Sequence, residues 1–186
     1  MTLNNAFVAA ALAGKVCGTE SWSAPVTGSQ LSSFSIPDEL WNESEKNILA
    51  SAGVTVVESR NSFVTIRHAL TTDMTSADTS EISVVSLLDR VRKVTRDQLT
   101  ARFLGKGLTI DDALLGSIEA AVGTIWTGLI DDDEIAAYGT TNNPITGEIP
   151  IAVTQDASEP RRIHVVGSVS PLYPVTWIDV DLTTYV

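Results

Sequence analysis

The sequence has few of the residues that build disulfides, metal sites and catalytic centres. Among its 186 residues there is one cysteine, Cys17, and there are two histidines, His68 and His164. A single cysteine excludes an intramolecular disulfide and the metal motifs that need paired cysteines. The histidines are far apart in strand-like segments, where we expect them to pack or to face solvent. We therefore predict no metal site and no cofactor.

Long hydrophobic runs and excess positive charge are absent as well. No segment approaches the roughly 20 apolar residues of a membrane span, and residues 6–14 lack the basic start of a signal peptide. The net charge of −11 argues against nucleic acid or an anionic membrane surface as the main partner. We expect the protein to stay in the reducing cytoplasm where it is made, or to leave it only as part of something larger.

Familiar catalytic motifs are missing too. Gly105-Lys106-Gly107 lacks the spacing of a phosphate-binding loop and follows a predicted helix, so we interpret it as a turn. No nucleophile elbow occurs, and no histidine lies near a serine or cysteine in a known catalytic order. The acidic run 131–134 lacks the alternate spacing and glycine bend of a calcium loop, which favours a solvated turn. Nothing in the sequence supports an enzyme.

The sequence does contain two long amphipathic helices between residues 81 and 129. The opposite, polar face of the first helix carries Asp89 four residues before Lys93, a favourable order for an ion pair. The second is predicted to begin with Thr109 as its N-cap. The predicted apolar face of the first helix consists of Val84, Leu87, Leu88, Val91, Val94 and Leu99. The predicted apolar face of the second consists of Ile110, Leu114, Ile118, Ala121, Val122, Ile125 and Leu129.

Shorter helices and strands flank this helical pair. Helices are predicted over 4–15 and 37–53, the latter ending at Gly53. The alternating or β-branched segments predicted as strands are 54–57, 63–70, 135–138, 149–153, 163–169 and 177–182. This order predicts an α+β fold, with a mixed or antiparallel sheet packed against the two long helices.

Two features favour contacts with other molecules. Half of the twelve basic residues lie between 90 and 106, which suggests either a solvated face or a docking stripe for an acidic surface. Arg102 falls on the apolar side, so either the helix has ended there or Arg102 meets a partner. The final strand could close its own sheet or pair with the sheet edge of another subunit.

The order of these segments resembles the C-terminal region of contractile phage tail sheath proteins. The residues that carry the resemblance are NILASAGVTVV (47–57), VTIRHALTTD (64–73), LLDRVRKVTRDQL (87–99), IWTGLI (125–130) and IHVVGSVSPLYPVTWIDVDL (163–182), with AFVAAALAG (6–14) matching more loosely. Thr55 stands where the family usually has asparagine. Family members are usually longer, with an N-terminal arm and outer domains that are not visible here.

The resemblance implies a mechanical role. Sheath subunits form helical rings around a tail tube and rearrange, after a baseplate trigger, to drive the tube through the host envelope without consuming nucleotide. It implies that residues 1–52 belong to the preceding sheath region and that 53–186 form the C-terminal domain. It also implies a location in the virion tail, with three partners: other copies in a helical polymer, the tail tube protein and baseplate proteins.

The resemblance also suggests which residues make those contacts. A charged helix of the family lies against the tube, which makes Arg92, Lys93, Arg96, Arg102 and Lys106 the candidates for tube contact. The predicted strand that augments a neighbouring subunit is Trp177, Ile178, Asp179, Val180, Asp181 and Leu182. Two alternatives stay open: another ring-forming tail or baseplate component with the same domain, and a small cytoplasmic enzyme with dispersed carboxylates.

Overall fold

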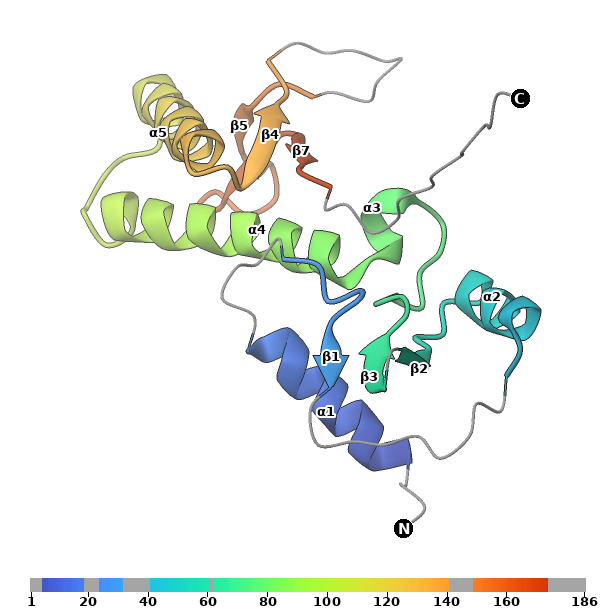
Figure 1. Ribbon diagram of the computed structural model, residues 1–186. Coiled ribbons are helices and arrows are strands. Elements are labelled where there is room, and N and C mark those ends of the chain that lie inside the picture. Colours follow the sequence, from blue (N-terminus) through green and yellow to red (C-terminus); the bar gives the residue numbers. More distant parts are fainter. Residues whose placement is uncertain (1–4, 19–23, 32–40, 61, 141–148, 174–186) are drawn as a thin grey trace, which may run out of the picture. The chain divides into compact units, whose positions relative to one another are not determined.

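The computed structural model describes residues 5–18, 24–31, 41–60, 62–140 and 149–173 (Figure 1). These residues form two compact units. The described residues up to Ser86, together with Tyr173, make the first unit, and Leu87–Leu172 make the second. The helix α4 (Ile82–Phe103) begins in the first unit and continues in the second.

The first unit is built around a small antiparallel sheet in the order β1-β3-β2. The strands are β1 (Gln30–Leu31), β2 (Val57–Arg60) and β3 (Phe63–Ile66). β2 and β3 form a hairpin in which Val57 pairs with Ile66 and Arg60 with Phe63. The helices of this unit are α1 (Asn5–Cys17), α2 (Glu43–Ser51) and α3 (Ala77–Ser80).

One apolar core holds the sheet of the first unit together. Val26, Leu31, Val64, Ile66 and Ala69 are buried in it, and Ile66 is fully inaccessible to solvent. Half-buried side chains of α1 pack against this cluster. The spacing of these residues places them on one face of their strand or helix. Burial of these faces against each other stabilises the short elements, because it removes apolar surface from water.

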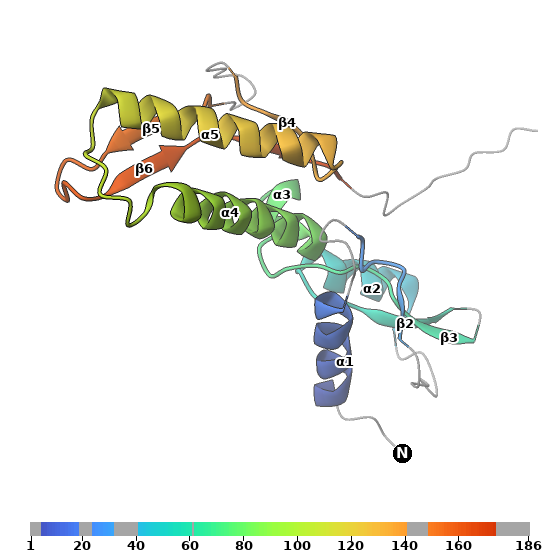
Figure 2. The same cartoon turned by 90° about the vertical axis from the view of Figure 1, so that its left-hand side faces the viewer.

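The second unit contains the long helical pair and four short strands. The helix α5 (Asp112–Asp131) follows α4, and the strands are β4 (Ile135–Tyr138), β5 (Ala152–Gln155), β6 (Ile163–Val166) and β7 (Val169–Pro171). β4 pairs with β7 and β5 with β6, both antiparallel. The two helices and the β5–β6 hairpin are seen together in Figure 2. Among the described helices, α5 alone is long and apolar enough to cross a membrane, a test that buried core helices also pass.

Helix α5 supplies most of the core of the second unit. Its buried residues are Ile118, Ala121, Val122, Ile125, Trp126 and Leu129. All of them except Ala121 form one cluster with Val91 of α4, Ile135 of β4 and Val153 of β5. Five of the seven apolar residues predicted for this helix are therefore in its buried face, and α5 packs against β4 and β5 as an amphipathic helix does.

Trp126 has the most specific surroundings in this core. Its indole Nε1 donates a hydrogen bond of 3.0 Å to Thr95 Oγ1, and the Thr95 hydroxyl donates in turn to the carbonyl of Val91. The ring of Tyr138 meets the Trp126 ring edge-on, with centroids 5.7 Å apart. A Cβ at Gly167 would lie 2.7 Å from the indole, so only glycine lets the chain pass this ring. Trp126 thus connects α4, α5 and the strands.

Several sequence expectations need correction. The described strands form three small antiparallel sheets, where we expected one. The N-cap of α5 is Asp111 and not Thr109. The Asp111 carboxylate accepts the N–H of Leu114 at 2.8 Å. Aspartate is as good an N-cap as threonine, and Asp111 directly precedes the first residue of the helix. The helix predicted over 37–53 begins at Glu43 among the described residues, since Asn42 and Glu45 form a capping box. Its end is confirmed, because Gly53 has a φ of +74°.

Gly139→Ala is expected to destabilise the second unit. A Cβ at Gly139 would lie 2.3 Å from the carbonyl oxygen of Ile149, which is backbone and can move only if the chain shifts. We expect a loss of about 1–3 kcal/mol, typical of overpacking. Gly116→Ala is the control, because nothing lies within 4 Å of the added methyl and a helical alanine gains roughly 0.5–1 kcal/mol over glycine. Equal urea midpoints for the two variants would contradict this account.

Candidate assembly surfaces

The predicted basic residues of the helical pair are all exposed. Arg92, Lys93, Arg96 and Arg102 project from α4, and Lys106 lies in the connection to α5. Arg102 lies inside the helix, which extends to Phe103, so the expectation that the helix could end before it is wrong. Its guanidinium donates to Gln98 Oε1 at 3.3 Å.

Two of these basic residues form ion pairs with acidic residues of the same helix. Arg92 bonds to Asp89 at 2.8 Å, and Lys93 bonds to Asp97 at 2.7 Å, so the Asp89–Lys93 pair expected from spacing is not the one that forms. All four side chains are at least 60% exposed, and exposed pairs contribute about 0–1 kcal/mol. These pairs can therefore exchange partners at little cost. Arg96 has no ion pair among the described residues.

The five basic residues do not share one face. At about 100° per residue, Arg92 and Arg96 lie roughly 40° apart around α4, whereas Arg102 lies about 180° from Lys93. A flat partner that contacts Lys93 therefore cannot contact Arg102. The structure divides the predicted stripe into a helix face (Arg92, Lys93 and Arg96) and a second group beside the α4–α5 connection (Arg102 and Lys106).

One basic residue of the same segment has a structural role that the sequence did not reveal. Arg90 bonds to both carboxylate oxygens of Glu134, with Nε–Oε2 and Nη2–Oε1 distances of 2.7 Å. Glu134 raises the pKa of Arg90, and such two-point pairs are the strong form of the arginine–carboxylate contact. The acidic run 131–134 is thus a turn at the end of α5, as expected, but its last member is tied to α4.

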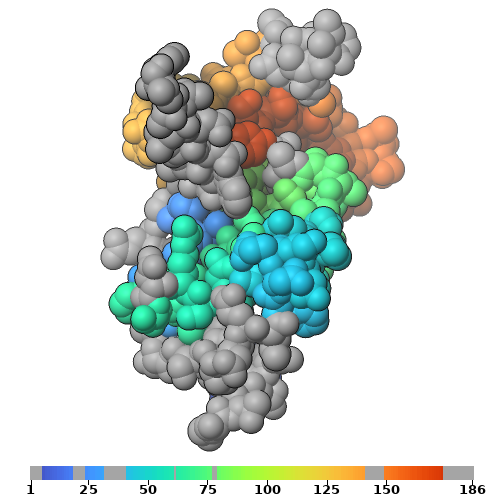
Figure 3. Space-filling view, turned by 45° about the vertical axis from the view of Figure 1, so that its right-hand side comes forward, coloured from blue at the N-terminus to red at the C-terminus, as the bar shows by residue number. Residues whose placement is uncertain are grey.

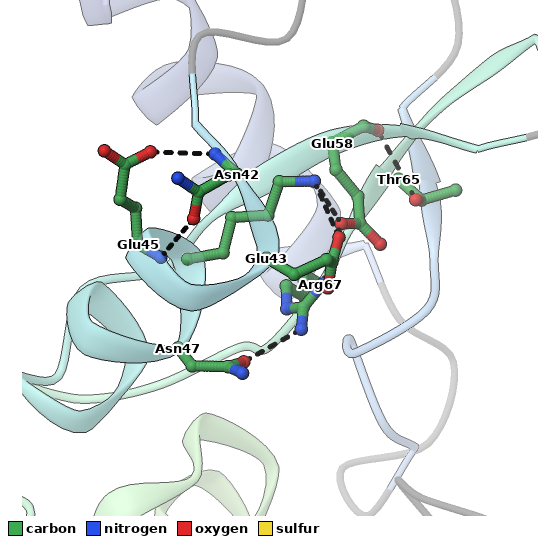
Figure 4. Close-up of polar contacts among 8 residues, drawn as sticks. Asn42, Glu43, Glu45, Asn47, Glu58, Thr65 and Arg67 are labelled. Carbon is green, nitrogen blue, oxygen red and sulfur yellow. Dashed lines mark hydrogen bonds and ion pairs between the residues drawn. The ribbon is translucent and has the colours of Figure 1, made fainter.

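In the first unit, α2 is fixed to the β2–β3 hairpin by charges (Figure 4). Lys46 bonds to Glu58 at 3.1 Å and to Glu43 at 3.2 Å, and Arg67 bonds to the same two carboxylates at 3.1 and 2.7 Å. Arg67 also donates to the side-chain oxygen of Asn47 at 2.9 Å. Bonds from Arg67 and Lys46 lower the pKa of Glu43. This cluster of Glu43, Lys46, Glu58 and Arg67 is called the α2 network below.

Two large apolar side chains, one in α2 and one just before it, are exposed. The one buried residue of α2 is Lys46, whereas Ile48 is 65% exposed, and Trp41, seven residues earlier, is 50% exposed. Figure 3 shows the surface of α2 in cyan, open to solvent on the face drawn. A surface helix normally buries its apolar side, so periodicity alone would not have predicted how α2 is held.

The strand expected to reach a neighbouring subunit, 177–182, lies outside the described residues. The described part of the second unit offers strand edges instead. β5 and β6 pair only with each other among the described strands, as do β4 and β7. Each pair therefore has outer edges on which a further strand could add backbone hydrogen bonds.

One of the two histidines, His164, has a structural partner. His164 Nε2 lies 2.7 Å from Asp156 Oδ2, and Asp156 Oδ1 also accepts the N–H groups of Ser158 and Glu159 in the β5–β6 turn. The hydrogen bond to His164, then those to Ser158 and Glu159, hold the pKa of Asp156 well below its usual range. The described residues contain no group of three histidine, cysteine, aspartate or glutamate side chains that could hold a metal.

Thr55, at the position where the family usually has asparagine, makes two hydrogen bonds to the backbone. Its hydroxyl donates to the carbonyl of Leu70 and accepts the N–H of the same residue, both at 3.1 Å. Thr55 thus joins the segment before β2 to the segment after β3, because a hydroxyl can donate and accept at once.

The chain resembles one curated protein in sequence. It is 30% identical over 179 residues to the tail sheath protein of Mycobacterium phage Bxz1. The aligned region covers 96% of this chain and 29% of that protein. The chain thus spans less than a third of the curated relative it matches. No family model matches the chain.

Solved structures of similar fold come from contractile particles. A chain in the baseplate of the anti-feeding prophage has a TM-score of 0.71 at 13% identity, over 94% of this chain and 48% of that one. The helical sheath of the same particle in its contracted state gives 0.65 at 14% identity, over 92% and 48%. The sheath tail protein of Listeria innocua gives 0.62 at 18% identity, over 81% and 35%. The predicted resemblance to tail sheath proteins is therefore confirmed in sequence and in fold.

Proposed function

We propose that this chain is a structural subunit of a contractile tail sheath, located in the virion tail and without catalytic activity. The observation that carries the proposal is the resemblance to a tail sheath protein over 96% of the chain, together with a fold similar to that of a contracted helical sheath. The described helices and small antiparallel sheets support the proposal, because their fold is similar to that of solved sheath structures.

In this role the chain would polymerise as helical rings around a tail tube. Rearrangement of those rings, started from the baseplate, would then drive the tube through the host envelope. Strand exchange is our proposal for how copies hold one another: residues 177–182 would add to a free edge of the β4–β7 or β5–β6 pair in a neighbour. We propose the domain boundary near residue 52, just before Gly53 ends α2.

For contact with the tube we propose the helix face of α4, formed by Arg92, Lys93 and Arg96. These side chains are exposed, they lie on one side of the helix, and the acids beside them are exposed as well. An acidic tube surface could replace Asp89 and Asp97 as partners at little cost, since exposed pairs are weak.

Counting copies in purified particles tests the proposed function. We expect the chain in many rings per particle, at a fixed ratio to the tube protein, when particles are analysed by quantitative mass spectrometry and electron microscopy. One ring's worth of copies would instead favour another tail or baseplate component. Absence from the particles would contradict the proposal.

Reversal of the helix-face charges tests the tube contact. We expect Arg92→Glu with Arg96→Glu to abolish sedimentation of the chain with tube particles at low ionic strength, where charge pairs are screened least. Lys15→Glu with Arg60→Glu is the matched control, because both side chains are exposed in the first unit. Tube binding that persists in the helix-face variant would remove this contact.

A further inference from the structure

The connection between α4 and α5 presents leucines to solvent. Leu104 is 73% exposed and Leu108 is 51% exposed, and Lys106 lies exposed between them. Gly105 and Gly107 have φ values of +73° and +69°, a conformation that keeps the connection short and turned outward. Burial of a leucine side chain is favourable, so two exposed leucines beside a cation offer a surface on which a partner could pack. Residues 104–108, with Arg102, are called the hairpin tip.

The other end of α5 is acidic. Asp131, Asp132 and Asp133 are all exposed there, at the negative end of the helix dipole, where an acidic side chain is unfavourable. None of these three residues forms an ion pair with the described part of the chain. Asp132 does act electrostatically on Arg90, whose hydrogen bonds go to Glu134. These exposed carboxylates are therefore open to a cation from another molecule. They are called the acidic end.

The two surfaces cannot meet within one chain. They lie at opposite ends of α5, as Figure 2 shows, and a helix of 20 residues is about 30 Å long. The acidic residues next to the hairpin tip interact with the N-terminus of α5, unlike those of the acidic end. Asp111 and Asp112 lie at the positive end of α5, where Asp111 accepts the N–H of Leu114, so the helix itself engages their charge. Arg102 and Lys106 remain available.

We propose that the hairpin tip of one copy docks on the acidic end of a second copy. Lys106 and Arg102 would pair with the aspartates, and the leucines would pack beside them. Because the two surfaces differ, the contact is head-to-tail, and repetition of such a contact produces rings or helical filaments. The inference deepens the proposed sheath function and rests on it, since it names one contact of that polymer.

Complementary charge reversals test this contact. The tip variant is Arg102→Glu with Lys106→Glu, and the end variant is Asp131→Lys with Asp133→Lys. We expect the wild-type chain to form oligomers in sedimentation velocity as concentration rises, and each variant alone to lose them by at least tenfold in apparent affinity. Mixing the two variants, or combining all four substitutions in one chain, restores opposite charges across the contact and should restore the oligomers. Lys15→Glu with Arg60→Glu is the control for the tip variant, because both side chains are exposed outside the two surfaces, and it should self-associate as the wild type does.

Each contrary result has a defined meaning. A wild-type chain that stays monomeric overturns the inference, as does failure of the mixture to recover. If the tip variant self-associates normally but no longer binds tube particles, the tip contacts the tube instead and the inference is wrong. A chain that is absent from the particles but shows the charge-swap pattern refutes the sheath function alone. If the tip variant forms normal rings, the inference is wrong while the proposed sheath function still stands.

Discussion

Trp126→Ala is expected to destabilise the second unit by about 3–5 kcal/mol, the usual cost of truncating a buried aromatic side chain. Trp126 is 6% exposed and belongs to the core shared by α4, α5 and the strands. Its removal leaves a cavity beside Gly167 and Tyr138, and it takes the indole donor away from Thr95. Urea unfolding, followed by circular dichroism and by hydrogen exchange of the α5 amides, measures the loss.

Two further variants separate the causes. Trp126→Phe keeps an aromatic ring but removes the N–H, and it should cost about 1 kcal/mol for the lost hydrogen bond plus a smaller packing term. Trp41→Ala is the matched control, because this tryptophan is 50% exposed and surface substitutions usually stay within about 0.5 kcal/mol. If Trp41→Ala and Trp126→Ala shift the midpoint equally, the core described for the second unit is wrong.

Glu58→Ala should destabilise the first unit by a similar amount, about 3–5 kcal/mol, because it breaks a buried charge network. Lys46 is 3% exposed, and both its ammonium and the Arg67 guanidinium lie 3.1 Å from the Glu58 carboxylate. Without that carboxylate the two cations repel each other in a region with little access to water. The free energy of unfolding in urea, with hydrogen exchange in β2 and β3, provides the measurement.

The matched control for Glu58 is Glu43, which contacts the same two cations. Its side chain is 70% exposed, so water can replace it, and Glu43→Ala should have a much smaller effect than Glu58→Ala. High salt should weaken the effect of Glu43→Ala further while leaving that of Glu58→Ala nearly unchanged, since buried pairs are screened less. An equal loss from both variants would show that burial does not govern the α2 network.

The two long helices were predictable because apolar residues recur at helical spacing on the face that is buried. Ile118, Val122 and Ile125 recur at helical spacing, and the structure buries them. The end of α2 was predictable from Gly53, since a left-handed residue there favours glycine. Trp126 was missed, although it follows Val122 by four residues and this spacing places it at the edge of the same buried face.

The candidate contact residues were only partly predictable from the sequence. The basic residues of α4 were found by composition, and their exposure agrees with a contact role. Their division into a helix face and a hairpin tip needed the extent of α4 through Phe103. Arg90 could not be separated from them by sequence, because its partner Glu134 is 44 residues away. The augmenting strand 177–182 stays a prediction.

By itself the sequence determined the absence of disulfides, the acidic character, the long helical pair and the resemblance to tail sheath proteins. These properties depend on residue type, local spacing and the order of segments along the chain. Only the tertiary structure decided that Lys46 is buried, that Trp126 bonds to Thr95 and that Arg90 belongs to Glu134. Such contacts join residues distant in sequence, and their energies depend on burial and geometry, which local patterns do not encode.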